Sequence, residues 1–487
     1  MYALAVKRGE LEHQLVKTNP WWRATPRGRK WTEDDPDLKG AAEAPFVYRP
    51  RPLDGISPSG VYRLFGPRRV GKSVELKRAI ASLIERDIHG RRIVHAACDT
   101  WRAEDLDILV DVLDGLSPPA AGPRYVFLDE ITAIRGDWVT KIKWLHDNTS
   151  LRHDCVVLSG SSAESLEQAR SELAGRRGSA VDADRFLLPM GFRAFCQASG
   201  VDLPQVPIVH PRDLLGREAV EAIQMLRVHL NDLVPAWERY LEVGGFPRAV
   251  AGWVDDRQVS DTFLRDLWDV VYGEALRAED RWTATESQRL LEQVSARMAH
   301  PFVVQNAARE LGVHRDTLQL RLHRLTRGFV AWPCFQNDGQ DRPRLRAQRK
   351  FYFLDPLLAR LAWHRAPEQV APPDYTVLTE QQLGVILLRA RESEAPGTLP
   401  DFDTLLYATT PSRKEIDFTG AWLGGLPYEG KYIEGDTWLR DGITAEKAYG
   451  RGVLVTRTIT DRVRDLLAAP ACLLGLLLDC SPLDAIE

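Results

Sequence analysis

The sequence predicts an α/β protein with a parallel sheet covered by helices on both faces, followed by a helical region and a second, smaller α/β domain. Two observations carry most of this prediction. A glycine-rich turn, Gly66-Pro-Arg-Arg-Val-Gly-Lys-Ser73, lies between a strand-like and a helical segment. Strand-like segments at 61–65, 92–98, 125–129, 155–159 and 185–189 then alternate with helical ones. That alternation is typical of a parallel sheet whose ligands bind at the carboxyl ends of its strands.

The glycine-rich turn fits the phosphate-loop pattern G-x-x-x-x-G-K-[ST] without a mismatch. Glycines in such a turn allow backbone N–H groups to surround phosphate oxygens, and the following helix adds its positive N-terminal end. The sequence therefore predicts an ATP site whose binding residues are Gly66, Pro67, Arg68, Arg69, Val70, Gly71, Lys72, Ser73 and Val74.

Residue types within this site indicate separate roles. We expect Lys72 to reach the β- and γ-phosphates of ATP and the Ser73 hydroxyl to hold Mg²⁺. A second apolar strand, Tyr125-Val-Phe-Leu-Asp-Glu130, ends in two carboxylates. Asp129 is expected to contact the magnesium ion through water, and Glu130 to orient and polarise the attacking water. The alternative for this acidic pair is two solvated carboxylates at the end of a strand.

The next strand, Cys155-Val-Val-Leu158, ends in the polar run Ser159-Gly-Ser-Ser162. A polar side chain at this edge of the sheet would lie beside the phosphate loop and sense the γ-phosphate of ATP. Ser159 is the first candidate for this role and Ser161 the second. An ordinary helix N-cap is the alternative interpretation.

Composition bounds the class of protein. The chain of 487 residues is 44% hydrophobic and 27% charged, which is typical of a globular protein with several domains. Its net charge of −4 means that any affinity for nucleic acid must come from local patches. The cysteines show no C-x-x-C spacing, which favours reduced thiols and a cytoplasmic location. No signal-peptide core is present, and the apolar run 471–478 is too short to span a bilayer, so no membrane association is expected.

Composition shifts along the chain suggest five regions. An N-terminal arm rich in proline and tryptophan, including Asn19-Pro-Trp-Trp22 and Trp31, is expected to pack on the sheet domain through its aromatic side chains. In the helical region, Gly244-Gly-Phe-Pro247 must interrupt a helix. The predicted regions are the arm at 1–58, the ATP-binding core at 59–191, a helical lid or linker at 192–284, a fourth region at 285–356 and a last α/β domain at 376–487.

The fourth region has the order helix, turn, helix and hairpin, which predicts a winged helix. Its helices are expected near 303–311 and 316–326, and its strands at 329–335 and 350–354. Basic residues are concentrated on the second helix and in the hairpin loop, which is the electrostatic pattern of DNA binding through a helix and a wing. The alternative is a winged helix used only for packing. The basic residues are Arg315, Arg321, His323, Arg324, Arg327, Arg342, Arg344, Arg346, Arg349 and Lys350.

The last domain contains Asp417, Glu429 and Lys431 in the spacing D-x(11)-E-x-K. Restriction endonucleases and related proteins use this pattern, with two carboxylates binding Mg²⁺ and the lysine helping to activate water. Asp417 and Glu429 are thus candidate metal ligands, and all three are candidate catalytic residues. Glu380 is either a further carboxylate of this site or, as we favour, a surface acid. Strands are also expected at 452–456 and 471–478, and a helix near 445–449.

The turn between the two strands of this motif decides whether the three side chains meet. A strict two-residue turn at Gly424-Gly425 would pair Asp417 with Tyr432, so that Asp417 points away from Glu429 and Lys431. A three-residue loop or a glycine bulge instead places Asp417 opposite Lys431, and all three side chains share one face. The sequence predicts the bulged or longer loop.

Taken in order, these motifs resemble those of the prokaryotic AAA-type P-loop ATPases that carry a C-terminal domain of unknown function with a restriction-endonuclease-like core. The resemblance covers most of the chain. The matching segments are Asn19-Pro-Trp-Trp22, Gly66-Pro-Arg-Arg-Val-Gly-Lys-Ser73, Phe127-Leu-Asp-Glu130, Ser159-Gly-Ser-Ser162, Leu173-Ala-Gly-Arg176, Leu188-Pro-Met-Gly-Phe192, Gly244-Gly-Phe-Pro247, Phe351-Tyr-Phe-Leu-Asp-Pro356, Glu415-Ile-Asp-Phe418 and Glu429-Gly-Lys431.

The resemblance implies nucleotide binding and ATP hydrolysis, with Arg176 as a candidate γ-phosphate contact or a local ion-pair partner. The chain departs from the family pattern in its phosphate loop, where Arg69 and Ser73 replace glutamine and threonine, and in Gly430, which replaces valine. Ser73 keeps a metal-binding hydroxyl. Gly430, in contrast, is expected to weaken a central strand, which argues against an active nuclease site.

Three functions are compatible with these observations. The first is an Mg²⁺-dependent ATPase that couples its nucleotide state to engagement of DNA. The second is a nuclease, gated by ATP, that uses the C-terminal Asp417 site. The third is a nucleotide-switched scaffold for a protein partner, in which the nuclease-like domain is degenerate. Oligomeric state and DNA sequence preference do not follow from the sequence.

Overall fold

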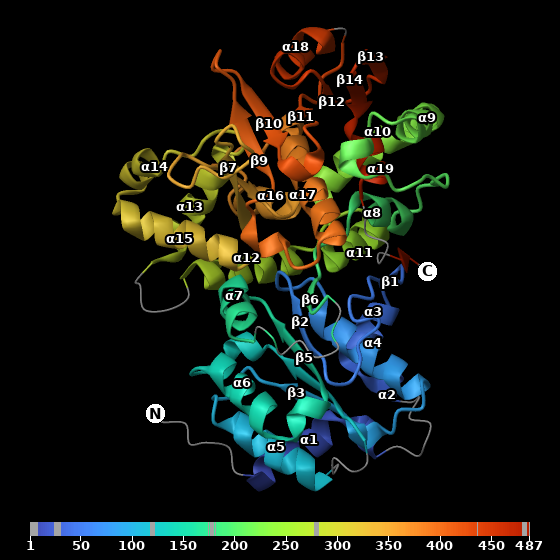
Figure 1. Cartoon of the computed structure of the whole chain (residues 1–487), viewed down its shortest axis with the longest axis vertical. Coiled ribbons are helices and arrows are strands. Elements are labelled where there is room, and N and C mark those ends of the chain that lie inside the picture. Colours follow the sequence, from blue (N-terminus) through green and yellow to red (C-terminus); the bar gives the residue numbers. More distant parts are fainter. Residues whose placement is uncertain are drawn as a thin grey trace. The chain divides into compact units, whose positions relative to one another are not determined.

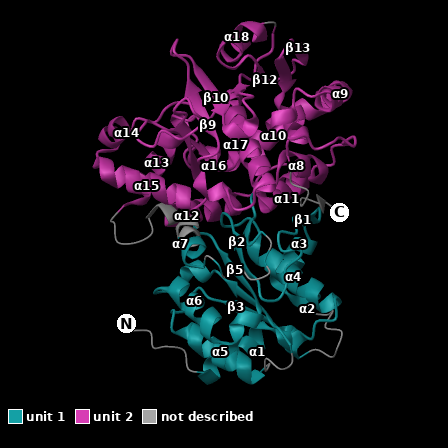
Figure 2. Cartoon of the chain, in the orientation of Figure 1, with its two compact units in different colours: residues 1–188 teal, residues 189–487 magenta. Residues whose placement is uncertain are grey.

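The computed structural model describes residues 8–23, 31–116, 122–173, 175, 180, 182–276, 282–435, 437–479 and 485–486. The chain divides into two compact units, Met1–Leu188 and Pro189–Glu487, which Figure 2 colours separately. Within the described residues, no helix combines the length and the apolar character needed to cross a membrane. The five cysteines in this part of the chain are buried and carry free thiols, and Cys480 lies outside it.

The first unit is built on the parallel sheet that the sequence predicts. Its strand order is β3-β4-β5-β2-β6, and every neighbouring pair is parallel. The strands are β2 (Val61–Phe65), β3 (Ile93–Ala97), β4 (Tyr125–Asp129), β5 (Cys155–Gly160) and β6 (Asp184–Phe186). The helices are α1 (Arg8–Thr18), α2 (Trp31–Asp34), α3 (Pro36–Ala42), α4 (Lys72–Glu85), α5 (Asp105–Leu116), α6 (Trp138–Asn148) and α7 (Ala163–Glu172).

Alternate residues of the strands supply two apolar cores, because successive side chains of a strand point to opposite faces. On one face, Val126 and Leu128 of β4 pack with residues of α1, α5 and α6. On the other, Tyr125 and Phe127 pack with residues of α4 and with tryptophans of the N-terminal arm. Figure 1 shows these helices flanking the sheet of the first unit. Both faces are therefore covered, as a fully parallel sheet requires.

The N-terminal arm closes the edge of this sheet. Strand β3 is an edge strand, and the buried Asn19 side chain pairs with its backbone as a further strand would. The Asn19 amide donates to the His95 carbonyl at 2.9 Å, and its oxygen accepts from the His95 N–H at 2.6 Å. Trp21 and Trp22 donate their indole N–H groups to the Ile93 carbonyl at 2.9 and 2.8 Å. The predicted packing of the arm through its aromatic residues is confirmed, and the Asn-Pro-Trp-Trp motif is a cap on β3.

We expect Asn19→Ala to destabilise the first unit by about 3 kcal/mol, because it leaves the buried N–H and C=O of His95 without partners. The free energy of unfolding from urea titration measures the effect. Asn148→Ala is the matched control, since Asn148 is an exposed asparagine at the end of α6 in the same unit. Equal unfolding midpoints for the two variants would contradict this role of Asn19.

The second unit combines many helices with one mixed sheet. The helices are α8 (Phe192–Ala198), α9 (Arg217–Leu226), α10 (Leu230–Val243), α11 (Pro247–Asp256), α12 (Asp261–Leu276), α13 (Ala284–Ala296), α14 (Val304–Leu311), α15 (Arg315–Arg327), α16 (Pro356–Arg365), α17 (Tyr375–Glu394), α18 (Trp438–Tyr449) and α19 (Ala471–Leu477). The strands are β7 (Ala331–Gln336), β8 (Lys350–Phe353), β9 (Leu406–Thr409), β10 (Glu415–Thr419), β11 (Tyr428–Gly430), β12 (Gly452–Thr456), β13 (Asp461–Val463) and β14 (Leu466–Pro470).

The sheet of the second unit joins two regions that the sequence treats as separate. Its order is β13-β14-β12-β11-β10-β9-β7-β8, so the hairpin of the predicted winged helix continues the sheet of the last α/β domain. The junction is the parallel pairing of β7 with β9, where Phe335 lies opposite Leu406. Because the strands form one continuous ladder, side chains of β8 and β10 lie in the same layer of the protein.

Two motifs far apart in the sequence meet around Asp355. Helix α10 ends at Val243, and α11 begins at Pro247, so Gly244-Gly-Phe-Pro247 interrupts the helix as predicted. The Asp355 carboxylate accepts the Gly245 N–H and the Leu357 N–H, both at 2.8 Å, and so caps α16. A Cβ atom on Gly244 would lie 2.2 Å from the Asp355 carboxylate, and the φ of Gly244 is +74°. Complete burial raises the pKa of Asp355 to about 7, although both N–H groups oppose the shift.

One element differs from its prediction. The apolar run 471–478, expected as a strand, forms helix α19, and the strand before it is β14. Every residue of α19 is buried, so the run lacks the polar face that would mark helical periodicity. Its alanine and leucine residues favour a helix over a strand, and Pro470 is the residue before the helix begins.

Candidate functional site

The phosphate loop connects β2 to α4 through backbone conformations that need glycine. The φ of Gly66 is +156°, and a Cβ atom there would lie 2.0 Å from the Leu187 carbonyl oxygen. Gly71, at φ +103°, precedes the first residue of α4 in a left-handed conformation. The two glycines of the motif thus let the chain reverse beside β6 and enter the helix with its first N–H groups turned toward the loop.

Lys72 lies against the loop that precedes it. Its side chain is buried, and Nζ donates to the carbonyls of Gly66 and Pro67 at 3.0 Å each. The ammonium group is therefore held on the inner side of the turn, where the motif binds phosphate. Arg68, also in the loop, donates from Nε to the Ser161 hydroxyl at 3.2 Å, which links the phosphate loop to the segment after β5.

Asp129 ends β4 beside the phosphate loop and is held ionised by its neighbours. The Ser159 hydroxyl donates to its carboxylate in a short hydrogen bond, and His95 Nε2 lies 3.8 Å from it. Burial by itself raises the pKa of Asp129, but the neighbouring His95, Ser159 and Ser73 side chains outweigh burial and lower this pKa to about 2. The Asp129 carboxylate is thus anionic at neutral pH, and Ser73 is one of the neighbours that keep it so.

Glu130 follows Asp129 in a strained conformation. Its φ is +52° and its ψ is +40°, a left-handed region that non-glycine residues enter at a cost and that is common at functional sites. Its backbone N–H donates to Asp129 Oδ1 at 3.1 Å and to Ser159 Oγ at 3.2 Å. Among the described residues, nothing hydrogen-bonds its buried Oε2 atom. The local structure therefore fixes the backbone of Glu130 and leaves one carboxylate oxygen able to accept a proton or a hydrogen bond.

Ser159 and Ser161 occupy different places after β5. Ser159 bridges Asp129 and the Glu130 N–H, and Ser161 contacts Arg68 of the phosphate loop. Neither serine caps α7, because the residue before this helix is Ser162, whose side chain makes no capping hydrogen bond. Arg176 lies outside the described residues, so its role stays a prediction.

The donor set around the phosphate loop fits a magnesium ion. Mg²⁺ takes oxygen ligands and is commonly held by one or two protein groups together with phosphates and water. The Ser73 hydroxyl and the ionised Asp129 carboxylate are ligands of this kind, and Ser73 is among the neighbours that lower the pKa of Asp129. His95 was not identified from the sequence; its signal there is weak, since it is one histidine in an apolar strand.

The C-terminal motif residues also come together, with a register two residues away from the expected one. Phe418 pairs with Tyr428, which places Asp417 opposite Glu429 and on the same face as Lys431. A long connection containing the short helix η9 (Ala421–Leu423) joins the strands, so there is no tight two-residue turn. Lys431 Nζ lies 2.9 Å from Glu429 Oε1, and Asp417 Oδ2 accepts the Gly430 N–H at 2.9 Å.

A lysine from β8 occupies the centre of this group of acids. Lys350 Nζ lies 2.7 Å from Glu415, 3.1 Å from Glu380 and 3.1 Å from Asp417, and its side chain is fully buried. We call Lys350, Glu380, Glu415 and Asp417 the Lys350 cluster. Burial alone would lower the pKa of Lys350, but the surrounding acidic groups raise it above its ordinary value. Among the described residues, no group of three or more His, Cys, Asp or Glu side chains is arranged to hold a metal ion.

Two expectations are corrected by this cluster. Glu380 is not a surface acid: it is buried on α17, and burial together with Asp417 raises its pKa above the ordinary value. Lys350 is not part of the basic surface of the hairpin loop, because β8 carries it into the interior. Gly430 also lies close to α17: a Cβ atom there would lie 3.2 Å from Glu380 Cα, so a side chain at this position would require α17 or β11 to shift by a few tenths of an ångström.

The basic residues of 285–356 divide into buried and exposed groups. Arg321 is fully buried on the inner side of α15, with its guanidinium 4.8 Å from the centre of the Trp282 ring, so it is not available to DNA. Arg315 on α15 and Arg344 and Arg346 in the hairpin loop are exposed. The elements run α13, α14, α15, β7 and β8, so the two expected helices and the hairpin strands are present and follow a further helix, α13. That these elements form a winged helix stays a prediction. We call residues 284–353 the helix–hairpin module.

Comparison with known proteins places the first unit in a class. An AAA domain matches residues 59–196, and a domain of unknown function matches residues 234–368. The five-stranded parallel sheet with its phosphate loop has the α/β fold of a P-loop ATPase, and most of it lies within the residues that the AAA domain matches. The chain resembles AAA-type P-loop ATPases, as its motifs indicate, and its C-terminal half includes a domain whose function is not assigned.

Solved structures and curated proteins complete the comparison. The Walker-type ATPase PABY2304 of Pyrococcus abyssi aligns at 14% identity and a TM-score of 0.36, covering 74% of this chain and 99% of its own. The ORC1 protein of Aeropyrum pernix, in complex with DNA, aligns at 13% identity and a TM-score of 0.29, covering 69% and 92%. A variant of RuvB from Thermotoga maritima aligns at 14% identity and a TM-score of 0.25, covering 56% and 81%. No curated protein matches the chain.

Proposed function

We propose that this protein is an Mg²⁺-dependent ATP hydrolase that couples its nucleotide state to engagement of DNA. The observation that carries the hydrolase proposal is Glu130, strained at φ +52° next to the ionised Asp129, with a buried carboxylate oxygen that has no partner among the described residues. Backbone strain is maintained where the surrounding structure enforces it for function. A protein that only binds ATP has no need of a carboxylate held in this way.

Binding of ATP uses groups that the loop already positions. Backbone N–H groups of residues 66–73 and the first turn of α4 donate to the phosphates. Lys72 exchanges its two carbonyl contacts for the β- and γ-phosphates, which offer the stronger, charge-assisted hydrogen bonds. Ser73 and Asp129 would hold Mg²⁺, whose charge neutralises the phosphate oxygens when it is bound.

The chemical step depends on Glu130 and Ser159. Glu130 accepts a hydrogen bond from a water molecule and orients it toward the γ-phosphorus. Its carboxylate takes a proton from this water as the new oxygen–phosphorus bond forms and the bond from the γ-phosphorus to the β–γ bridging oxygen breaks, so that ADP leaves. Ser159 donates to Asp129 and accepts from the Glu130 N–H, so it links the metal-binding carboxylate to the base. Ser159 is thus suited to report the state of the γ-phosphate to the sheet.

The proposal of DNA engagement is supported by the helix–hairpin module. Net charge on the chain is negative, so a local excess of arginine marks the surface on which a polyanion would bind. In this module, Arg315 on α15 and Arg344 and Arg346 in the loop after β7 are exposed. Their guanidinium groups make no ion pair with any residue in the part of the chain that the structure describes, so their charge is available to a polyanion.

A second candidate function is a nucleotide-switched scaffold for a protein partner. The Lys350 cluster favours it over the nuclease alternative, because an ammonium group lies among the carboxylates that a nuclease would use for Mg²⁺. The nuclease interpretation requires a divalent ion to displace Lys350, which is fully buried.

ATP turnover by the full chain tests the proposal. Phosphate release is measured with Mg²⁺, with and without DNA, and DNA integrity is followed in the same samples. Turnover that DNA stimulates supports the proposed coupling. Turnover that ignores DNA favours the scaffold function, and the appearance of DNA fragments that Asp417→Asn abolishes would restore the nuclease interpretation.

A further inference from the structure

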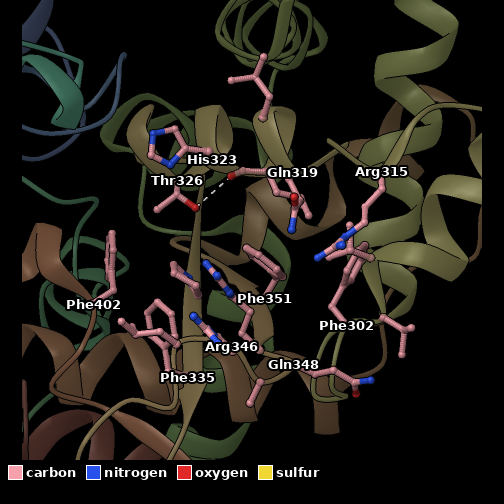
Figure 3. Close-up of a pocket in the computed structure, with 18 of the residues that line it drawn as sticks. Phe302, Arg315, Gln319, His323, Thr326, Phe335, Arg346, Gln348, Phe351 and Phe402 are labelled. Atoms are coloured by element: carbon pink, nitrogen blue, oxygen red, sulfur yellow. Dashed lines mark hydrogen bonds between the residues drawn. The ribbon is translucent and has the colours of Figure 1, made fainter. Parts of the chain in front are cut away.

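The helix–hairpin module contains a large open cavity of ≈ 920 Å³. Arg315, Gln319 and His323 line it from α15, where they are spaced four residues apart and so share one face of the helix. The opposite wall comes from the hairpin loop, from β7 and from the short helix η8 (Leu399–Asp401). Figure 3 shows side chains of α15 on one side of this space and Phe335, Arg346 and Gln348 on the other.

The lining of this cavity contains more basic than acidic side chains. Among the described residues, the guanidinium groups of Arg315, Arg346 and Arg349 form no ion pair, and Asp401 is the acidic residue of the lining. Arg349 is partly buried, and this burial lowers its pKa because no carboxylate offsets the loss of solvent. Unpaired arginines around a hollow attract an anion, and the planar guanidinium suits phosphate in particular.

The same cavity offers a surface for stacking. The Arg349 guanidinium lies 4.8 Å from the centre of the Phe335 ring, and Phe335 is only partly buried. Phe302 and Phe351 pack edge to face with ring centroids 5.5 Å apart and are buried beneath it. Aromatic rings and arginine planes are the groups on which unpaired bases stack. Phosphate-binding and base-stacking groups therefore line one space.

The shape of this space suits an unpaired strand better than a duplex. A helix that reads a duplex must stand clear of its neighbours to enter a groove about 12 Å wide. Here the face of α15 that carries Arg315, Gln319 and His323 looks onto a wall formed by 345–349 and 400–402. A volume of ≈ 920 Å³ lies within the range of about 300–1,000 Å³ that holds small ligands, which corresponds to a few nucleotides.

We propose that this cavity binds an unpaired segment of DNA, with the phosphates on Arg315, Arg346 and Arg349 and a base stacked on Phe335. The inference rests on the proposed engagement of DNA and specifies its form as single-stranded. Gln319 and Gln348 add hydrogen-bonding groups that can meet base edges.

Fluorescence anisotropy of the full chain with a labelled oligothymidylate, a blunt duplex and an RNA of equal length tests the inference. The parent protein is expected to bind the single strand more tightly than the duplex. Arg346→Ala/Arg349→Ala is expected to weaken single-strand binding roughly tenfold or more and to reduce the salt slope by about 1.4, since each phosphate contact on a single strand contributes about 0.7. Phe335→Leu is expected to weaken binding by roughly tenfold at an unchanged slope, because it removes a stack and no charge.

The matched control is Arg440→Ala/Arg451→Ala, which removes two exposed arginines of the second unit that do not line the cavity. This control is expected to change single-strand affinity by much less than the Arg346/Arg349 pair. Equal losses of single-strand affinity in the two double variants would overturn the inference, since they would indicate that the positive charge of the whole surface, and not the cavity, attracts DNA. Duplex binding as tight as single-strand binding overturns it while DNA engagement stands, and tighter binding of RNA overturns the assignment to DNA. Absence of binding to any DNA overturns the inference and the proposed DNA engagement together.

Discussion

Lys72→Ala is expected to lower ATP turnover by about 10²–10³-fold, because it removes the cation that the phosphate loop directs at the β- and γ-phosphates. In the structure the ammonium group is buried against the Gly66 and Pro67 carbonyls, inside the turn that binds phosphate. Phosphate release measures turnover, and a fluorescent ATP analogue measures binding, which is expected to weaken as well.

Lys77→Ala is the matched control for this variant. Lys77 lies on the same helix, α4, but binds Asp35 and Asp37 of the arm at 2.8 and 2.6 Å. Its replacement is expected to leave turnover near the parent value. If Lys72→Ala turns over ATP as fast as the parent, the phosphate loop is not part of the catalytic site.

Lys350→Met is expected to destabilise the second unit by about 3–5 kcal/mol, because removing one partner of a buried ionic group leaves uncompensated charge in the interior. Glu380 and Asp417, both at most 6% exposed, would lose the cation that lies 3.1 Å from each. The free energy of unfolding from urea titration measures the effect.

Lys431→Met provides the control for this variant. Lys431 contacts Glu429, and its side chain is 34% exposed. The same substitution there is therefore expected to lower the free energy of unfolding by about 1 kcal/mol or less. If both variants have the stability of the parent, the Lys350 cluster does not hold the sheet together. If millimolar Mn²⁺ stabilises the parent and Asp417→Asn abolishes that gain, the cluster exchanges Lys350 for a metal ion.

The local parts of the fold could be predicted because their signals are local. The phosphate loop, the strand that ends in Asp129 and Glu130, and the helix break at Gly244 each depend on residues within one short segment. Alternation of strands and helices then determines that the sheet is parallel, which brings the ends of β2, β4 and β5 to one edge.

The remaining features depend on contacts between distant segments. Asn19 meets His95 across 76 residues, and Lys350 meets Asp417 across 67, so no spacing rule indicates either contact. From the sequence, Lys350 is expected on an exposed hairpin. In the structure, β7 pairs with β9, so β8 belongs to the sheet of the last domain and Lys350 lies in the interior. The same pairing buries Glu380, whose neighbours in sequence gave no sign of an ionic partner.

The central claim, that Glu130 is the base of an ATP hydrolase, is tested most directly by comparing Glu130→Gln with the parent for ATP binding and phosphate release. Glutamine keeps the size and the hydrogen-bonding reach of glutamate but cannot take the proton. We expect ATP binding close to that of the parent and turnover lower by about 10²–10⁴-fold. Parent-like turnover in Glu130→Gln, with the same bound ATP, would contradict this account.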